Sequence, residues 1–469
     1  MKKKVLGYAI GPVGSGLIGL ITLPLLTWFY STEDIGRIAM LQVVASLSMM
    51  LFTLGLDQAY VREYYESTNK PKLLKHCVVL GFSLILLTFC LVITLSPTLL
   101  SKWLYGIPSN YLSIASVLCF VLTLLSRFLS LILRMQERAL AYSMSQLLPK
   151  VLFFLFITFS LTLALERDTN NLVTAHTLSI SAVFIIYAWN TRMEWIPALT
   201  ETLDKVFLKK LLKYGLPLII GSLAAWGLNV MDRLFLRSMS NFNELGIYSV
   251  TMSFASAATI IAAIFNTIWA PLVLKWSTEG LDTKKIDQIA ENVLAAVFFL
   301  TALAALFSWV LPIFLPEQYR SITYLLAICL LGPFFYTLSE TTAIGITLSR
   351  RTIYSMLASV GAVIINGVGN FLLVPRWGAL GAASATAIAF SFFYILRTEF
   401  ACLVWRKTPR LKAYAVVLLL TATTIANGFF VNYSTVMYFV WFCILILGSI
   451  WFKESLKNYL SYIYKRNRK

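Results

Sequence analysis

The sequence predicts an all-α polytopic membrane protein with about fourteen transmembrane helices. Of its 469 residues, 59% are hydrophobic and only 13% are charged, which exceeds what the core of a soluble protein uses. Apolar stretches of about 20 residues, enough to cross about 30 Å of hydrocarbon, recur along nearly the whole chain. Because backbone groups in a bilayer must be satisfied within the spanning structure, we expect each stretch to be a helix.

The spans follow one another with short loops. The first six are expected at residues 6–30, 36–59, 77–97, 110–133, 143–165 and 172–191. The next six are expected at 214–237, 246–274, 289–312, 321–347, 355–374 and 379–400, and the last two at 414–432 and 435–452. The apolar run after Lys4 continues to Tyr30 without an A-x-A cleavage site, so it is read as an uncleaved first span and not as a signal peptide.

The lysines and arginines predict the orientation. With alternate loops assigned to one side, thirty of the 39 basic residues share the side of the N-terminus. The opposite loops hold six: Arg37, Lys102, Arg167, Arg237, Arg320 and Arg376. The positive-inside rule therefore places both termini in the cytoplasm. Basic loops against anionic headgroups explain the net charge of +18, so we expect no nucleic-acid partner.

Short motifs indicate an internal duplication. Asp34-Ile35-Gly36 follows the first span, and Glu244-Leu245-Gly246 follows the seventh, 210 residues later. Tyr142-Ser143-Met144 recurs as Tyr354-Ser355-Met356, 212 residues later. Six spans per copy is an even number, which predicts two six-helix lobes of like topology related by pseudo-two-fold symmetry. The expected domains are an N-terminal lobe at 1–199, a cytoplasmic linker at 200–213, a C-terminal lobe at 214–405, and two extra helices with a basic tail at 406–469.

The residues that commonly hold metals or catalyse reactions are scarce. The six cysteines show no C-x-x-C spacing, and the only histidines are His76 and His176. This pattern favours neither a disulfide framework nor a metal site. We therefore expect no metal, no cofactor and no catalytic residue.

Basic residues within the first-lobe spans are candidates for substrate binding, because an ionised group near a helix centre costs about 2.5–3.5 kcal/mol. Arg127 lies about 10 Å inside the cytoplasmic end of the fourth span, at 1.5 Å per residue. Arg134 falls on the same helix face, and Lys150 lies at a similar depth in the adjacent span. They are expected to form a cationic wall, unless their long stems carry the charges to the headgroups.

Further charges lie in or beside other spans. Asp232 and Arg233 are in the seventh span, Glu340 is in the tenth, and Asp57 and Arg62 mark the end of the second. We expect Arg62 and Arg233 to add to the cationic cavity. The three acids are expected to form ion pairs, to hold the basic groups in place, or to titrate and couple transport to H⁺ or Na⁺. Fixed positive charge favours an anionic cargo, because a guanidinium binds phosphate in a bidentate fork.

Several motifs resemble a known family. Asp34-Ile35-Gly36, followed by the run from Leu54-Gly55-Leu56-Asp57 to Arg62-Glu63, resembles the N-terminal signature of bacterial polysaccharide transporters, the O-antigen flippases. Tyr214-Gly215-Leu216-Pro217 and Gly246-Ile247-Tyr248-Ser249 continue this resemblance. The stretch Asn370-Phe371-Leu372-Leu373-Val374-Pro375 resembles the wider superfamily of multidrug, oligosaccharidyl-lipid and polysaccharide exporters.

The resemblance covers the whole chain and implies a function. It implies two lobes in a V, alternating access, and a cargo of undecaprenyl pyrophosphate bearing an oligosaccharide. The cargo is then the O-antigen repeat of lipopolysaccharide or a related surface polysaccharide, moved from the cytoplasmic to the periplasmic leaflet. Expected partners are membrane lipids and, in the same pathway, a polysaccharide polymerase and a chain-length regulator.

Two other functions remain open. An ion-coupled multidrug exporter shares the fold but should favour carboxylates over basic residues in its first lobe. A polysaccharide polymerase or ligase handles the same lipid-linked sugars but needs a sizeable outer loop. The longest outer loop expected here, Thr98 to Ser109, has Lys102 as its only charge, and the chain contains no P-loop. We therefore expect a transporter and not an enzyme.

Overall fold

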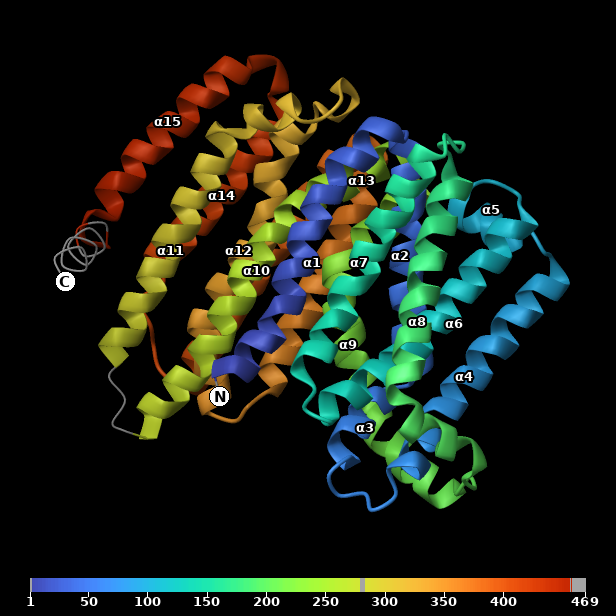
Figure 1. Cartoon of the computed structure of the whole chain (residues 1–469). Coiled ribbons are helices and arrows are strands. Elements are labelled where there is room, and N and C mark those ends of the chain that lie inside the picture. The colour runs from blue at the N-terminus through green and yellow to red at the C-terminus, as the bar shows by residue number, and fades with distance from the viewer. Residues whose placement is uncertain (1, 279–282, 456, 458–469) are drawn as a thin grey trace. The chain divides into compact units, whose positions relative to one another are not determined.

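The computed structural model describes residues 2–278, 283–455 and 457, and every regular element in these residues is a helix (Figure 1). The all-α prediction is confirmed. The first part of the chain forms α1 (Lys2–Phe29), α2 (Thr32–Thr53), α3 (Leu56–Glu63), α4 (Lys70–Leu95), α5 (Leu99–Tyr105), α6 (Asn110–Met135), α7 (Ala139–Thr162), α8 (Thr169–Thr200) and α9 (Lys205–Met239). The rest forms α10 (Phe242–Thr278), α11 (Thr283–Leu306), η1 (Ser308–Ile313), η2 (Glu317–Tyr319), α12 (Ile322–Leu348), α13 (Ile353–Val404), α14 (Leu411–Phe429), η3 (Val431–Tyr433) and α15 (Ser434–Trp451).

Twelve helices in the described part of the chain are long and apolar enough to cross a membrane. The predicted number of fourteen is reached when α10, which covers the expected span 246–274, is added and α13 is counted twice. α13 runs for 52 residues over both spans expected at 355–374 and 379–400, and its helix is broken at Gly378, with φ of 48° and ψ of −125°. A side chain there would collide with the Glu244 carboxylate, so the break requires glycine.

The chain divides into two compact units, Met1–Trp226 and Gly227–Lys469, with the boundary inside α9. In the first unit, α6 packs against α2, α4 and α8, and α1 lies along α7. Gly11 and Gly14 bring α1 close to Ser143 and Leu147 of α7. The lobe boundaries drawn from the sequence, at residues 199, 213 and 405, stay predictions.

The second span is shorter than predicted. The sequence predicts one helix over 36–59, whereas α2 ends at Thr53 and a separate short helix, α3, starts at Leu56. Leu54 and Gly55 break the helix with φ of 53° and 69°. A Cβ on Gly55 would overlap the backbone of Gly215, so this close approach also needs glycine. The break reorients α3 and with it Asp57.

Contacts within the two units recur at the offset seen in the sequence. In the first unit, Thr169 at the start of α8 donates a hydrogen bond to the Asp34 carboxylate. In the second unit, the backbone N–H of Ala379, just after the α13 break, donates to the Glu244 carboxylate at 2.8 Å. Each pair is separated by 135 residues, and the two pairs are 210 residues apart. The acidic turn after each leading helix therefore makes an equivalent contact.

The turns that end α6 and α12 also correspond. Glu137 and Arg350 both have a φ of 56°. In each turn, the backbone N–H of the next residue donates a hydrogen bond to the carbonyl five residues earlier. These bonds run from Arg138 to Leu133 and from Arg351 to Ile346. The Tyr-Ser-Met triplets lie near the start of the helices that follow these turns, α7 and α13.

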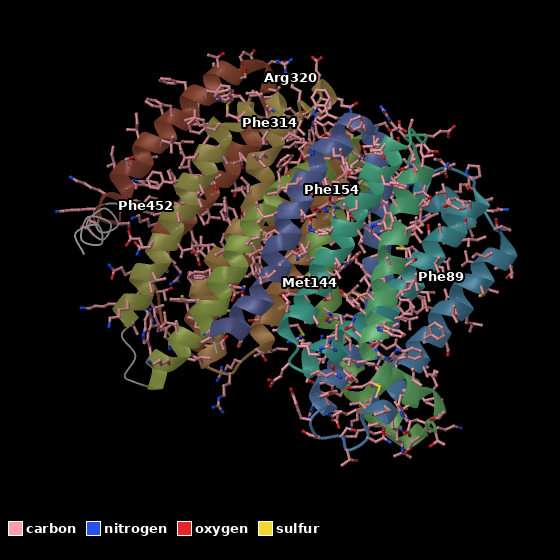
Figure 2. All side chains as sticks on the ribbon, viewed as in Figure 1. Phe89, Met144, Phe154, Phe314, Arg320 and Phe452 are labelled. Carbon is pink, nitrogen blue, oxygen red and sulfur yellow. The ribbon has the colours of Figure 1, made fainter. Side chains whose placement is uncertain are left out.

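In the second unit, α12 packs against α10, α11, α13 and α14, and α15 packs against α11. Phe452 follows α15 (labelled in Figure 2), and its ring centroid lies 5.6 Å from that of Phe298 on α11. The two C-terminal helices are therefore an integral part of the second unit.

Candidate functional site

Arg127 of α6 forms an ion pair with Asp57 of α3. Its Nη2 and Nε lie 2.8 and 3.3 Å from Oδ2 of Asp57. The two side chains are 28% and 13% exposed, so the pair is largely shielded. The partner of Asp57 is thus Arg127 and not Arg62, the nearest basic residue in the sequence. Residues five apart on a helix point to different faces, and the Arg62 guanidinium lies over the ring of Tyr214, 4.4 Å from its centroid.

Arg127 also borders a cavity of about 240 Å³ within the first unit. The wall comes from α6, α7 and α8, with Met49 from α2, and its other polar side chains are Thr123, Ser126, Ser130, Tyr142, Ser145, Gln146 and Tyr187. The Ser126 hydroxyl is buried and has no hydrogen-bond partner in the described residues. A guanidinium has five donors, and Arg127 directs only Nε and Nη2 to Asp57. Its remaining donors can serve an anion.

Arg134 and Lys150 are not among the residues that line this cavity. Arg134 is exposed at the end of α6, where its guanidinium lies 5.8 Å from the centroid of the Tyr142 ring. Lys150 of α7 points to α1. Its Nζ lies 3.4 Å from where a Cβ would stand if Gly19 of α1 carried a side chain. It makes no ion pair with any described residue. The structure therefore does not bring all three residues into one cavity, but it leaves Lys150 as an unpaired cation within a span.

Asp232 of α9 lies in a polar cluster of the second unit and is 1% exposed. Its carboxylate accepts hydrogen bonds from Asn370 Nδ2 at 2.8 Å, from Thr386 Oγ1 at 2.6 Å and from the Tyr248 hydroxyl. These donors come from α13 and α10, and all are neutral. The Asn370 side-chain oxygen is buried without a donor in the described chain. The cluster thus contains an enclosed acid that accepts no hydrogen bond from a basic side chain among the described residues.

Arg233 follows Asp232 but does not pair with it in the described structure. Adjacent helical residues point about 100° apart, and the Arg233 Nε is buried with no hydrogen-bond partner among the described atoms. The two charges interact through space without a direct contact, and the expected role of Asp232 in holding a basic group in place stays a prediction.

Glu340 of α12 pairs with Arg397 of α13, with Nη1 and Oε1 2.6 Å apart. The same Nη1 donates to Ser339 Oγ at 2.8 Å, and the guanidinium lies 5.1 Å from the centroid of the Phe393 ring. Sequence reasoning grouped Arg397 with the basic loops and missed it as a partner. The signal that could have found it is the presence of one acid and one base within neighbouring spans of the same lobe.

The chain is similar in sequence to known membrane and polysaccharide-biosynthesis proteins. The sequence model of a family described as polysaccharide biosynthesis protein matches residues 1–277. Protein 1 of the Lsg locus of Haemophilus influenzae is 22% identical over 413 residues, which cover 82% of this chain and 95% of that protein. An uncharacterized membrane protein of Methanocaldococcus jannaschii is 22% identical over 399 residues, with 78% and 77% covered.

Solved structures with the same fold are transporters by name. The lipid II flippase MurJ in an inward closed conformation has a TM-score of 0.68 at 15% identity, covering 96% of this chain and 99% of that chain. A multidrug resistance transporter of the MATE family in an inward-facing conformation has a TM-score of 0.54 at 14% identity, covering 87% and 99%. At these identities the likeness shows the fold, that of the two-lobe transporters.

Proposed function

Because the chain belongs to the polysaccharide biosynthesis protein family, we propose that it is a flippase for an undecaprenyl-pyrophosphate-linked oligosaccharide. The cargo is an O-antigen repeat or a related surface-polysaccharide unit, moved from the cytoplasmic to the periplasmic leaflet by alternating access. The protein acts in the bacterial inner membrane with both termini in the cytoplasm, beside a polysaccharide polymerase and a chain-length regulator. The bias of lysines and arginines to one side supports this orientation.

One observation carries the proposal: of two basic residues within the spans of the first unit, one lines a polar cavity and the other has no acidic partner among the described residues. Arg127 borders the cavity with free guanidinium donors, and Lys150 has no acidic partner among the described residues. A cation without an acid in a membrane is costly, and an anionic ligand offsets that cost. Pyrophosphate suits these donors, because guanidinium and ammonium groups both bind phosphate oxygens.

Asp57 has a positioning role in this mechanism. It holds the Arg127 guanidinium by two of its five donors and leaves the other three for a ligand of the cavity that Arg127 lines. The Asp57–Arg127 pair is neutral as a whole, so Lys150 supplies the net positive charge of these three residues. That charge distribution supports an anionic cargo over the cationic drugs that an exporter of the same fold would carry.

We assign ion coupling to the Asp232 cluster of the second unit. Three neutral donors surround the carboxylate, and no basic side chain among the described residues donates a hydrogen bond to it; Arg233 interacts with it only through space. A proton or Na⁺ supplies the missing positive charge, with the Asn370 side-chain oxygen as a further ligand for Na⁺. Binding and release of that cation then change the packing of α9 against α10 and α13.

Polymer display in a strain lacking the native gene tests the proposal. The Arg127→Ala, Lys150→Ala double variant should lose display and accumulate lipid-linked oligosaccharide, with normal membrane abundance. Arg192→Ala is the matched control, since Arg192 is half-buried, lies over the ring of Trp189 and does not line the cavity. Full display from the double variant would contradict phosphate binding by these residues. Accumulation of short polymer in place of the lipid-linked unit would instead indicate a polymerase.

A further inference from the structure

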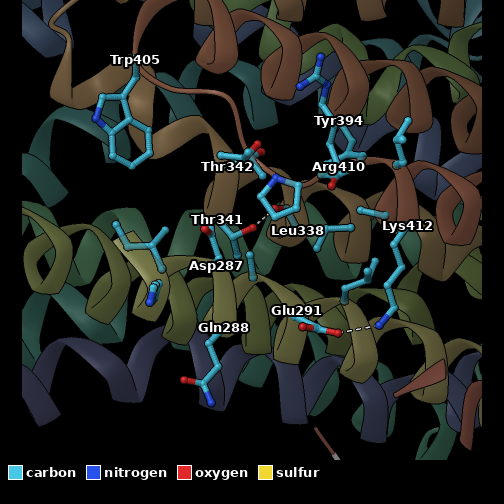
Figure 3. Close-up of a pocket in the computed structure, with 18 residues that line it drawn as sticks. Asp287, Gln288, Glu291, Leu338, Thr341, Thr342, Tyr394, Trp405, Arg410 and Lys412 are labelled. Atoms are coloured by element: carbon cyan, nitrogen blue, oxygen red, sulfur yellow. Dashed lines mark hydrogen bonds and ion pairs between the residues drawn. The ribbon is translucent and has the colours of Figure 1, made fainter. Parts of the chain in front are cut away.

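The second unit contains a larger pocket at the end of the bundle where α13 leads into α14. Its volume is about 560 Å³, within the range of about 300–1,000 Å³ typical of ligand sites. Apolar and aromatic side chains cover its walls, among them Leu294 of α11, Leu338 of α12, Tyr394 of α13 and Leu411 of α14. Figure 3 shows Trp405 and Lys412 on opposite sides of it. We call it the α11–α14 pocket.

The rim of the α11–α14 pocket is charged. Lys412 pairs with Glu291 at 2.6 Å, Arg410 pairs with Glu399 at 2.6 Å, and Arg406 donates two hydrogen bonds to Asp287 (Figure 3 shows the first pair). The segment between α13 and α14 carries three cations and no acid, Arg406, Lys407 and Arg410, and Lys412 follows in the first turn of α14. Of the charged residues that line the pocket, Lys284, Arg410 and Lys412 are cations and Asp287 and Glu291 are acids, which leaves the rim with an excess of one positive charge.

The start of α14 adds to this positive potential. α14 begins at Leu411, and Arg410 at its N-cap makes no side-chain capping bond. The first N–H groups of a helix lack partners within the helix, and the aligned peptide dipoles make this end positive. Leu411, Lys412 and Ala413 of this first turn all line the pocket.

We propose that the α11–α14 pocket binds one anionic phospholipid. Its phosphodiester lies at the rim beside Arg410, Lys412 and the first turn of α14, and an acyl chain enters the apolar interior. The single negative charge of the phosphodiester matches the one excess positive charge on the rim. Trp405 also lines the pocket, and tryptophan side chains are enriched at the headgroup level of a bilayer. The lipid is a structural ligand of the second unit that ties α14 to α11, α12 and α13.

This site differs from the proposed cargo site, which lies in the first unit. Binding is therefore measured without transport, and failure of either proposal leaves the other standing. The full-length protein is purified in detergent, stripped of lipid and titrated with dioctanoyl phosphatidylglycerol. Native mass spectrometry gives the stoichiometry, and thermal unfolding gives the stabilisation.

Three variants and three competing ligands make the test specific. Ala413→Trp fills the pocket and should abolish saturable binding; if it does not fold, Ala290→Leu on the facing helix takes its place. Lys284→Ala removes a lining cation and should weaken binding about two- to fivefold, as for a partly solvated charge contact. Lys285→Ala is the matched control, because Lys285 is not among the lining residues, and it should bind as the parent does.

One phosphatidylglycerol per chain, lost with Ala413→Trp and not matched by dioctanoyl phosphatidylcholine, supports the proposal. Equal stabilisation by phosphatidylcholine, or unchanged binding by Ala413→Trp, would overturn it in favour of non-specific lipid contact. Equal competition by inorganic phosphate would mean a free-anion site. Preferential binding of undecaprenyl phosphate would mean that the pocket belongs to the cargo's path, and the phospholipid assignment would be wrong.

Discussion

Replacing Asp57 with Asn should destabilise the first unit by removing the acid that faces Arg127. Breaking a fully buried pair costs about 3–5 kcal/mol, and an exposed pair contributes about 0–1 kcal/mol. The Arg127–Asp57 pair is 28% and 13% exposed, with a contact of 2.8 Å, so we expect a loss of about 1–3 kcal/mol. The assay is thermal unfolding of purified protein in detergent, together with polymer display in cells.

The double variant Asp57→Asn, Arg127→Met separates stability from transport. Removing both charges leaves no unpaired ion, so most of the lost stability should return. Display should stay absent, because the phosphate-binding cation is gone. Glu66→Gln is the control. Glu66 is an exposed acid nearby, so this variant should change neither the unfolding temperature nor polymer display. Normal display from the double variant would refute the role given to Arg127, and an unchanged unfolding temperature for Asp57→Asn would refute the energetic reasoning.

Three further predictions concern other parts of the chain. Asp232→Asn keeps a side chain of similar shape, so the membrane abundance of the variant should stay within about twofold of the parent's. The dependence of transport on H⁺ or Na⁺ should disappear. Ion dependence like that of the parent would contradict the coupling role. Glu340→Gln leaves Arg397, which is 11% exposed, without its acid, and should cost about 2–4 kcal/mol in thermal unfolding; an unchanged midpoint would show the pair to be dispensable. Gly55→Ala would strain a backbone with a φ of 69° and place a Cβ against the Gly215 backbone, so it should lower the free energy of unfolding by at least about 2 kcal/mol. Gly221 has open space around it, so Gly221→Ala should be neutral or stabilising by up to about 1 kcal/mol. Equal unfolding midpoints for the two variants would contradict this reasoning.

The fold class followed from the sequence because hydrocarbon imposes length and apolarity on each span. The duplication was also visible, since the acidic turns at Asp34 and Glu244 make equivalent contacts in their units. The break between α2 and α3 was missed. A left-handed Leu54 beside Gly55 depends on the close approach of Gly215, 160 residues away, and local apolarity does not report such contacts.

The charge partners were harder to predict than the charges themselves. Depth along a span follows from counting residues, which is how Arg127, Asp232 and Glu340 were found. Pairing depends on how each helix is rotated and on which helix lies next to it. That information decided that Asp57 faces Arg127 and not Arg62, and that Glu340 faces Arg397.

Translocation by the purified protein tests the central claim most directly. Vesicles containing undecaprenyl-pyrophosphate-linked oligosaccharide in the outer leaflet are prepared with and without the protein, and a glycosidase added outside measures how much cargo remains accessible. The parent protein should move cargo inside and protect it, while the Arg127→Ala, Lys150→Ala double variant should protect no more than protein-free vesicles. Equal protection by the parent and the double variant, or none by the parent under any ion gradient, would contradict the account.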